Sequence, residues 1–373
     1  MPRITGGQVL GEAMPTGDQS CLTVEDLHNN DLVFDELVQL VGSGEAVALI
    51  GAGSSMSAGF PSWDGLLRHL ASVARSYEPT FPALGGESRL IYADQLRQCL
   101  DEHEGPEFIE NQLAQLFRVP ARLVGFHDTL VRLPFRGFLT TNFDSVIEEA
   151  FQLVFGRRPN ALPVSGGDGS RVGSTLRSLT TRAAVSDIFH LHGHVNQPQT
   201  IVLSSQDYIR AYGFDCEVLG QPPANRRHTR LWTLMTALLT TRRLVFLGFS
   251  LEDHYLRLLL SRVTDMSWEW DSNTHIAVLP IEAEKAESQR AYVSQLRREL
   301  GVGTILYEVV AREHSQRDVL VDRLLQTVGP IGPAQAGPPS GEVPVGGAAA
   351  GRPLDWVDRQ NTFFEAKARR RGD

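Results

Sequence analysis

Short apolar runs alternate along the chain with stretches in which apolar residues return every three or four positions. The apolar runs are typical of buried strands, and they cover residues 46–50, 137–141, 187–191, 244–250, 275–280 and 303–309. The periodic stretches are typical of helices with one buried face, and they cover residues 27–41, 63–76, 146–155, 230–243, 255–263, 283–300 and 318–328. This alternation predicts a Rossmann-like, doubly wound α/β fold, in which helices cover both faces of a mostly parallel sheet.

Other segments depart from this alternation. Helical spacing continues without an intervening strand over residues 78–130, which predicts a helical insertion. Residues 157–182 are rich in glycine, serine and proline, and we expect a long loop or a small insertion there. We therefore expect one domain over residues 23–328, preceded by a flexible segment at residues 1–22.

The C-terminal part has a different composition. Proline, glycine and alanine dominate residues 329–353, which predicts a disordered linker. The following residues 354–373 form a short basic tail that contains Trp356, Phe363 and Phe364. Two interpretations of this tail stay open, namely a frayed basic terminus and a short helix that docks on a partner protein.

The composition narrows the class of protein. With 373 residues, 42% of them hydrophobic and 21% charged, the chain is long enough for one large α/β domain or two smaller ones. A net charge of −9 argues against direct binding to nucleic acid, because phosphate contacts need a basic face. No apolar run reaches the length of a membrane span and no signal-peptide pattern opens the chain, so we expect a cytoplasmic protein without a membrane partner. Three scattered cysteines, Cys21, Cys99 and Cys216, fit a reducing compartment and supply no cysteine zinc module.

A glycine- and serine-rich loop follows the first predicted strand. The segment Val47–Trp63 runs from an apolar strand through this loop into a helix, which is the order that phosphate binding needs. We expect Gly51 and Gly53 to adopt positive φ and to leave their N–H groups uncovered, while Ser54, Ser55 and Ser57 add hydroxyl donors. The loop is not a standard dinucleotide fingerprint, because Met56 occupies the place of the third glycine, which comes later at Gly59. A plain tight turn between strand and helix therefore stays open as an alternative.

Polar residues also follow three later strands, where a doubly wound fold places its ligand crevice. These groups are Thr140-Thr-Asn-Phe-Asp144, His190-Leu-His-Gly-His194 and Gly248-Phe-Ser250, the last followed by Asp253. Each has a plain structural alternative: Asn142 or Asp144 caps the helix from Val146, Asp253 caps the helix 255–263, and Ser250 is a turn serine.

The three alternating histidines raise the question of a metal site. A continuous strand would place His190, His192 and His194 on one face, as metal ligands require, but we expect Gly193 to end or bend the strand. No metal is therefore expected. His192 precedes this glycine in the predicted crevice, which makes it a candidate catalytic residue rather than a purely structural one.

Taken in order, these four segments resemble those of the sirtuin-like NAD-binding family. The matching segments are Gly51-Ala-Gly-Ser-Ser55 with Gly59-Phe-Pro61, Thr140-Thr-Asn-Phe-Asp144, His192-Gly193 and Gly248-Phe-Ser250, and they span roughly residues 30–310. The resemblance implies that Asn142 and His192 are catalytic, that the glycine loop holds the NAD pyrophosphate and that Ser250 lines the adenosine side. It also implies a set of NAD-binding residues: Gly51, Ala52, Gly53, Ser54, Ser55, Gly59, Pro61, Trp63, Asn142, Asp144, Gly248 and Ser250.

Departures from the family pattern indicate which branch of the sirtuin-like family this chain resembles. Sirtuin deacylases carry Pro-Asp-Phe-Arg after their loop and a four-cysteine zinc module, whereas this chain has Pro61-Ser-Trp-Asp64 and lacks that module. It looks more like the bacterial sirtuin-like NADases of anti-phage defence. The resemblance thus implies an NAD glycohydrolase that acts as a regulated, abortive-infection effector. It also implies assembly with itself or with a partner such as a DNA-translocating ATPase or an Argonaute-like protein.

Two alternatives to the NADase stay open. One is a non-catalytic module that senses NAD or ADP-ribose and gates a partner. The other is a protein deacylase or ADP-ribosyltransferase.

Overall fold

The computed structural model describes residues 20–86, 88–117, 123–166, 169–179, 185–213, 229–266, 275–310 and 313–331. Most of the expected flexible N-terminus, nearly all of the expected linker, and the basic tail lie outside these residues. Cys216 also lies outside them. Within the described ranges, no helix combines the length and the apolar character needed to cross a membrane.

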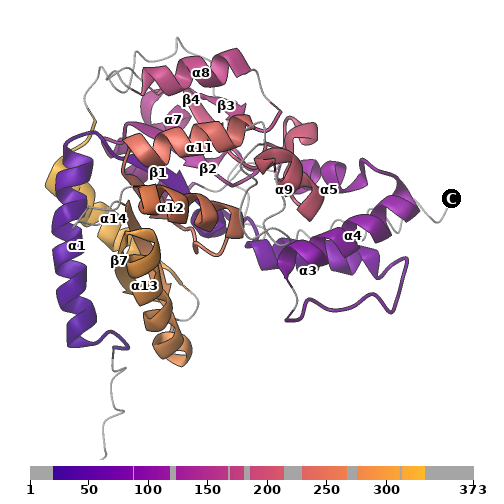
Figure 1. Cartoon of the computed structure of the whole chain (residues 1–373), viewed down its shortest axis with the longest axis horizontal. Helices are drawn as coiled ribbons and strands as arrows, with labels where there is room; N and C mark the ends of the chain where they lie inside the picture. The colour runs from indigo at the N-terminus through magenta and orange to yellow at the C-terminus, as the bar shows by residue number, and fades with distance from the viewer. Residues whose placement is uncertain are drawn as a thin grey trace, which may run out of the picture.

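A seven-stranded parallel sheet forms the centre of the molecule (Figure 1). Its strands follow the spatial order β3-β4-β2-β1-β5-β6-β7, and every pairing between neighbours is parallel. Their bounds are β1 Val47–Ile50, β2 Gly137–Thr140, β3 Asn160–Pro163, β4 Asp187–His190, β5 Leu244–Leu247, β6 His275–Ile281 and β7 Val302–Glu308. The predicted Rossmann-like, mostly parallel α/β fold is confirmed.

Helices cover both faces of the sheet because successive strand residues point to opposite sides. Val47 and Leu49 of β1 join one apolar core, and Ala48 and Ile50 join the other. The first core is closed by α8 Gly169–Ser178, α9 Ser205–Tyr212, α11 Arg230–Thr241, α12 His254–Met266 and α13 Ala286–Leu300. The second is closed by α1 Val24–Gly42, α6 Gly125–Arg132, α7 Val146–Phe155 and α14 Ser315–Val328.

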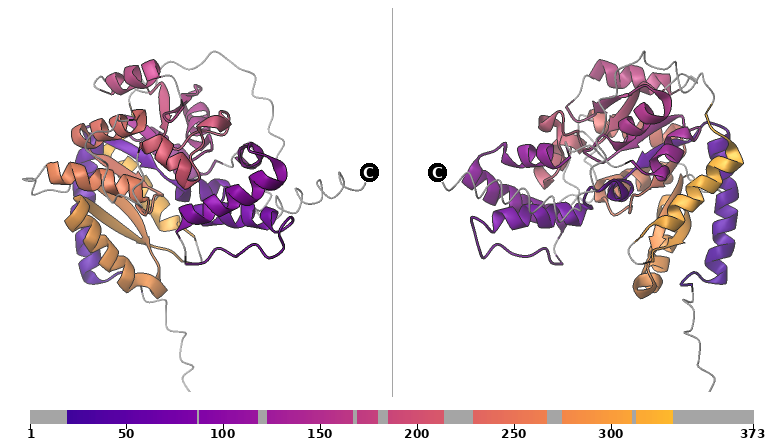
Figure 2. Two further views of the ribbon diagram at one scale, coloured as in Figure 1. Left: turned by 45° about the vertical axis from the view of Figure 1, so that its right-hand side comes forward. Right: turned by 180° about the vertical axis from the view of Figure 1, so that it is seen from behind.

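A helical layer with its own apolar core extends from one side of the sheet (Figure 2). It consists of α3 Trp63–Ala74, α4 Arg89–Glu104 and α5 Phe108–Phe117. Leu67 of α3, Leu96 of α4 and Leu113 of α5 share this core and are fully buried. The core of this layer thus includes α3, upstream of residue 78, whereas α6 packs against the sheet.

One part of the secondary-structure prediction was wrong. Residues 157–182 were expected to form a loop or small insertion, but they contain the edge strand β3 and the helix α8. β3 has only four residues and ends in Pro163, which an edge strand tolerates because its outer side needs no ladder hydrogen bond. Its short, mixed sequence gives no apolar run that would mark it as a strand.

The strand order creates a switch point beside β1. The chain leaves β1 for β2 on one side, and it returns later to build β5, β6 and β7 on the other side. In such sheets the ligand crevice lies at the carboxyl ends of the strands where the order reverses. Four consecutive strands, β4, β2, β1 and β5, bring the four predicted site segments to this one edge.

Candidate NAD site

The glycine loop is helical from its first residues. β1 ends at Ile50, α2 covers Ala52–Ser55, and a short 3-10 helix, η1, covers Met56–Ala58. The expectation of positive φ at Gly51 and Gly53 was wrong, because neither residue has it. These positions need glycine for another reason: a Cβ at Gly51 would lie 2.5 Å from the carbonyl oxygen of Gly248, and one at Gly53 would lie 2.9 Å from it.

The loops after β1 and β5 therefore touch through backbone atoms. The Gly51 N–H donates to the Leu247 carbonyl at 3.0 Å, and the Gly53 N–H donates to the Gly248 carbonyl at 2.9 Å. The expectation that these two N–H groups are uncovered was wrong as well. Gly248 does have positive φ, and a Cβ there would lie 2.4 Å from the Ser54 nitrogen. Glycine at all three positions allows this close approach at the switch point.

Two serine hydroxyls of the loop donate hydrogen bonds to backbone carbonyls of the loop itself. The Ser54 hydroxyl donates to the Gly51 carbonyl at 2.7 Å, and the Ser57 hydroxyl donates to the Ser54 carbonyl at 3.0 Å. Gly59 has φ of 93° and ends η1, which explains the late third glycine. Of the remaining predicted loop residues, Ala52, Pro61 and Trp63 are partly buried, and Trp63 packs against the core of the helical layer.

Two residues outside the predicted set hold the loop from the opposite side. The buried guanidinium of Arg317, on α14, donates to the Gly53 carbonyl at 3.0 Å and stacks over the Phe126 ring at 4.0 Å. Nε2 of His127, on α6, lies 3.0 Å from the Ser54 carbonyl. No local sequence signal marks either residue, because both reach the loop only through the fold.

Asn142 has a fixed side-chain orientation. Its Nδ2 donates to the Gly51 carbonyl at 3.1 Å and to Oγ of Ser55 at 2.9 Å. Because a carbonyl oxygen can only accept, the amide nitrogen must face Gly51. Oδ1 then points elsewhere, and this buried atom has no hydrogen-bond partner. An unpaired buried acceptor is costly, which makes it an indicator of a ligand.

Asp144 lies in the same network. Its carboxylate accepts the backbone N–H of Val146 at 3.0 Å at the start of α7, so the structural role considered for it is confirmed. Burial raises the pKa of Asp144 to about 6, although the hydrogen bonds from Val146 and Ser55 act in the opposite direction. Ser55 thereby connects Asn142 to a carboxyl group that titrates close to neutral pH.

His192 lies in a separate, aromatic environment. Nε2 is 3.1 Å from the hydroxyl of Tyr212, and Nδ1 is 3.4 Å from the hydroxyl of Tyr208, both on α9. Tyr208 donates its proton to the Asp253 carboxylate at 3.0 Å, and this carboxylate lies 3.7 Å from Nε2 of His192. Burial lowers the pKa of His192, and the negative charge of Asp253 opposes that shift only in part.

Asp253 also has the predicted structural role, because its carboxylate accepts the Leu256 N–H at 2.9 Å near the start of α12. Its contact with Tyr208, and the place of Tyr208 and Tyr212 beside His192, were missed from the sequence. The tyrosines come from a helix that follows a 3-10 turn, η2 Pro198–Thr200, and nothing in the local pattern aims them at the histidine.

The neighbouring histidines belong to another cluster. β4 ends at His190 and Gly193 has φ of 89°, so the expected interruption of the strand is confirmed. Nε2 of His190 lies 2.8 Å from a carboxylate oxygen of Glu148 on α7, and the rings of His190 and His194 are 4.6 Å apart. Burial lowers the pKa of His194 to about 4.

The loop after β5 has a strained backbone. Leu251 is the single non-glycine residue with positive φ in the part of the chain that the structure describes, and it is fully buried. Tyr292 donates to the carbonyls of Ser250 at 3.1 Å and Leu251 at 2.8 Å, which holds this conformation. Ser250 is exposed, and strain of this kind gathers at functional sites.

The structure thus brings the predicted residues to one edge of the sheet in two groups. Asn142, Ser55 and Asp144 form one hydrogen-bonded group with Gly51, and His192 forms another with Tyr208 and Asp253. No hydrogen bond joins Asn142 directly to His192, both of which are described. The NAD-contact roles of these residues remain predictions.

Comparisons with known proteins show which domain and which proteins this chain is similar to. Residues 136–301 match the model of the SIR2-like domain, a range that starts after the glycine loop. The chain is similar to the NAD(+) hydrolase ThsA of Bacillus cereus (strain MSX-D12), with 26% identity over 264 residues, or 70% of this chain and 48% of that protein. It is also similar to the NAD(+) hydrolase ThsA of Acinetobacter baumannii (strain 532279), with 22% identity over 67% of this chain and 45% of that protein. The NAD(+) hydrolase ThsA of Enterococcus faecium shows 26% identity over 63% of this chain and 42% of that protein.

The chain spans about half the length of the curated relatives that it matches. The sirtuin-like resemblance predicted from the sequence is confirmed: residues 136–301 match a SIR2-like domain, and the chain is similar to NAD(+) hydrolases.

Proposed function

We propose that this protein is an NAD glycohydrolase that cleaves NAD to nicotinamide and ADP-ribose at the carboxyl ends of β4, β2 and β1. The observation that carries the proposal is the buried, unpartnered Oδ1 of Asn142, held in place by Gly51 and Ser55. The names of the relatives support the choice of reaction, since each is called an NAD(+) hydrolase.

Cleavage of NAD needs no general acid from the protein. Nicotinamide leaves NAD as a neutral molecule from a pyridinium, whereas ordinary glycosidases need a carboxylic acid to protonate their leaving group. The remaining tasks are to hold an oxocarbenium-like ribose and to deliver water to C1′. In our proposal, Oδ1 of Asn142 accepts a hydrogen bond from a ribose hydroxyl or from that water.

In this proposal, His192 acts as the general base that activates the attacking water. Because the Asp253 carboxylate takes the proton of Tyr208, the Tyr208 oxygen accepts from Nδ1–H of His192, and the lone pair lies on Nε2. Burial lowers the pKa of His192, so its imidazole is neutral at physiological pH. Nε2 lies 3.1 Å from the Tyr212 hydroxyl, so in our proposal this hydroxyl gives its proton to Nε2 and takes one from the attacking water. Asp253, 3.7 Å from Nε2, stabilises the imidazolium that results.

The phosphates are assigned to the glycine loop. Because the N–H groups of Gly51 and Gly53 donate to the β5 loop, we propose that this loop provides a close-fitting surface rather than a full set of donors. The buried guanidinium of Arg317, 3.0 Å from the Gly53 carbonyl, supports the loop from behind, and its charge is paired with the Asp318 carboxylate at 2.8 Å. Trp63 is proposed to shield the nicotinamide side, and Ser250 to line the adenosine side.

In the cell, we propose a regulated cytoplasmic effector of anti-phage defence that depletes NAD. An enzyme of this kind must be restrained until infection, so control by self-assembly or by a partner protein is part of the proposal. Candidate partners are a DNA-translocating ATPase and an Argonaute-like protein.

The test is nicotinamide release from NAD by the purified protein and by Asn142→Ala. We expect the substitution to lower kcat by a factor on the order of 100 or more, because it removes the oriented acceptor at the reacting ribose. Asn111→Ala, at an exposed asparagine of α5, is the matched control and should keep the wild-type rate. Equal rates for wild type and Asn142→Ala would overturn the assignment, and NAD binding without any turnover would favour the sensing module.

A further inference from the structure

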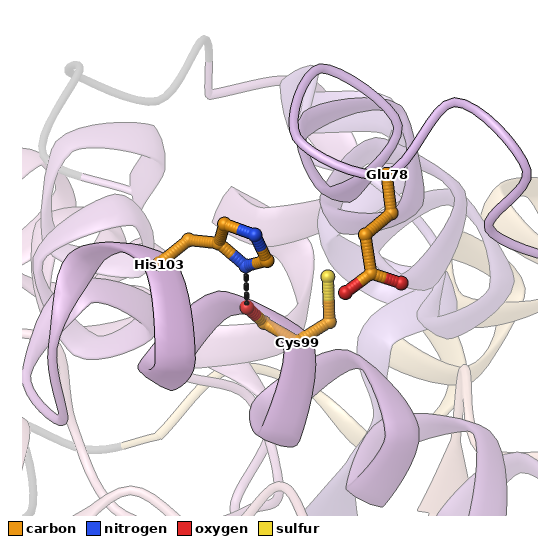
Figure 3. A group of neighbouring side chains, drawn as sticks. All are labelled: Glu78, Cys99 and His103. Atoms are coloured by element: carbon orange, nitrogen blue, oxygen red, sulfur yellow. Dashed lines mark hydrogen bonds between the residues drawn. The ribbon is translucent and has the colours of Figure 1, made fainter.

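A second group of reactive side chains lies in the helical layer, away from the proposed NAD site. Cys99 and His103 are four residues apart on α4, so they lie on the same face of the helix. Glu78 comes from the segment between α3 and α4. One ligand atom from each of the three lies within 4.8 Å of the others, and Figure 3 shows the Cys99 sulfur between the Glu78 carboxylate and the His103 ring.

The tautomer of His103 leaves one ring nitrogen available to a metal ion. Nδ1 lies 2.8 Å from the Cys99 carbonyl oxygen, which can only accept, so Nδ1 carries the proton and Nε2 keeps its lone pair. The ring also stacks on Tyr77, with centroids 5.1 Å apart and an interplanar angle of 26°. A backbone carbonyl that fixes the tautomer is a common support for metal-binding histidines.

We propose that Glu78, Cys99 and His103 form a zinc site. A thiolate, an imidazole and a carboxylate are the three ligand types that Zn²⁺ uses, whereas Ca²⁺ and Mg²⁺ use oxygen ligands. Bond lengths of about 2.0–2.3 Å in tetrahedral geometry require ligand atoms about 3.3–3.6 Å apart. The ligand atoms lie within 4.8 Å of one another, so they need to approach by at most about 1.5 Å. Water takes the fourth position. His103 is exposed, which gives the ion a path from solvent, whereas Cys99 is buried.

The buried cluster of Glu148, His190 and His194 is a poorer candidate, although its ligand atoms are equally close. All four ring nitrogens there already have partners. His190 contacts the Asn142 carbonyl and Glu148, and His194 contacts Ser145 and the Asn196 N–H. Although Oε2 of Glu148 is buried without a hydrogen-bond partner, neither histidine has a ring nitrogen left for an ion.

Zinc binding at the Cys99 site has a defined proton balance. A cysteine thiol carries its proton at neutral pH. Formation of the zinc–thiolate bond breaks the S–H bond and releases one proton to solvent. The Glu78 carboxylate, which accepts a hydrogen bond from the thiol in the metal-free protein, becomes a ligand instead.

The site would brace the helical layer against the NAD site. On the same helix as Cys99, Asp94 accepts the Ser205 N–H at 2.9 Å, and Arg97 pairs with Asp207 at 3.2 Å. Ser205 and Asp207 begin α9, the helix that places Tyr208 beside His192. A metal that fixes the α3–α4 connection therefore stabilises the support of the proposed base.

The experiment uses the full chain, stripped of metal and titrated with Zn²⁺ and with Co²⁺. We expect one Zn²⁺ per chain, the release of about one proton, a raised midpoint of thermal unfolding, and a thiolate-to-cobalt charge-transfer band with Co²⁺. His103→Gln should weaken Zn²⁺ binding by roughly tenfold or more, and it leaves the fold intact because His103 is exposed. Cys99→Ser should abolish the charge-transfer band.

Two matched controls accompany these variants. His28→Gln, at an exposed histidine of α1, and Cys21→Ser, at the other described free cysteine, should both bind zinc like the wild type. Failure of the wild type to bind zinc, an unchanged affinity in His103→Gln, or a charge-transfer band that survives Cys99→Ser would each overturn the proposal. These readouts do not depend on NAD cleavage.

Discussion

His190 and His192 are two residues apart, both are buried, and each has a carboxylate beside it. Their environments nevertheless shift their pKa values in opposite directions. At His190, burial alone would lower the pKa, but the Glu148 carboxylate at 2.8 Å and the Asn142 carbonyl raise it above its usual value. At His192, burial lowers the pKa, because the Asp253 carboxylate is 3.7 Å away and is already hydrogen-bonded to Tyr208.

The two pKa shifts differ because the Glu148 carboxylate contacts the His190 ring directly, whereas the Asp253 carboxylate lies farther from the His192 ring. Glu148, on α7, belongs to one face of the sheet, whereas Tyr208 and Tyr212, on α9, belong to the other. Direct contact makes His190 and Glu148 a buried ion pair that holds β4 to α7. Burial keeps His192 neutral, because the Asp253 carboxylate stays 3.7 Å away and offsets the effect only in part. A neutral imidazole is what a general base requires. We infer that His190 has a structural role, whereas His192 has the catalytic one.

The largest effect on stability is expected from breaking the ion pair. Glu148→Ala leaves the buried His190 without its partner and should lower the free energy of unfolding by about 3–5 kcal/mol. Chemical denaturation followed by circular dichroism measures this loss. Glu149→Ala, at a partly exposed residue that lies 3.7 Å from Arg158, should cost less than about 1 kcal/mol. Similar losses for the two variants would contradict the structural role of His190.

A smaller effect is expected at Asp253, which is a positioning residue in this account. The neutral form of His192 is the base, so activity falls as pH drops through its pKa, which burial has moved below 6.5. Asp253→Asn keeps a side-chain oxygen to cap α12 and removes the charge that raises this pKa. The acid limb of the kcat profile should therefore move to lower pH, and kcat at neutral pH should fall by about tenfold or less.

The adjacent Glu252 provides the control, because its side chain is exposed and Glu252→Gln should leave the pH profile unchanged. An acid limb that stays in place in Asp253→Asn, or that moves to higher pH, would show that Asp253 does not act through His192.

The sheet was predictable because its strands are buried on both faces. Val47–Ile50 and Leu244–Leu247 are continuous apolar runs, and runs of this kind mark central parallel strands. β3 escaped prediction because it is an edge strand, where burial does not select an apolar sequence. α8 escaped because Gly169 and Gly173 weaken its helical signal.

Only the site residues that directly follow a strand could be predicted from the sequence. Asn142 and His192 follow β2 and β4 directly, and the sheet rule alone brings them to one edge. Their partners depend on tertiary contacts. Position 51 needs glycine because a Cβ there would clash with the backbone of Gly248, about 200 residues later in the chain. Arg317 contacts Gly53 from the last described helix. Cys99 and His103 were overlooked as ligands because their third partner, Glu78, lies on a different segment.

The most direct test compares nicotinamide release from NAD by His192→Ala and by His28→Ala, which removes an exposed histidine of α1. Both variants are assayed at the same concentration of folded protein. The account predicts that His192→Ala loses at least about 100-fold in kcat while His28→Ala keeps the wild-type rate. A His192→Ala variant that releases nicotinamide as fast as His28→Ala would contradict the assignment of His192 as the base.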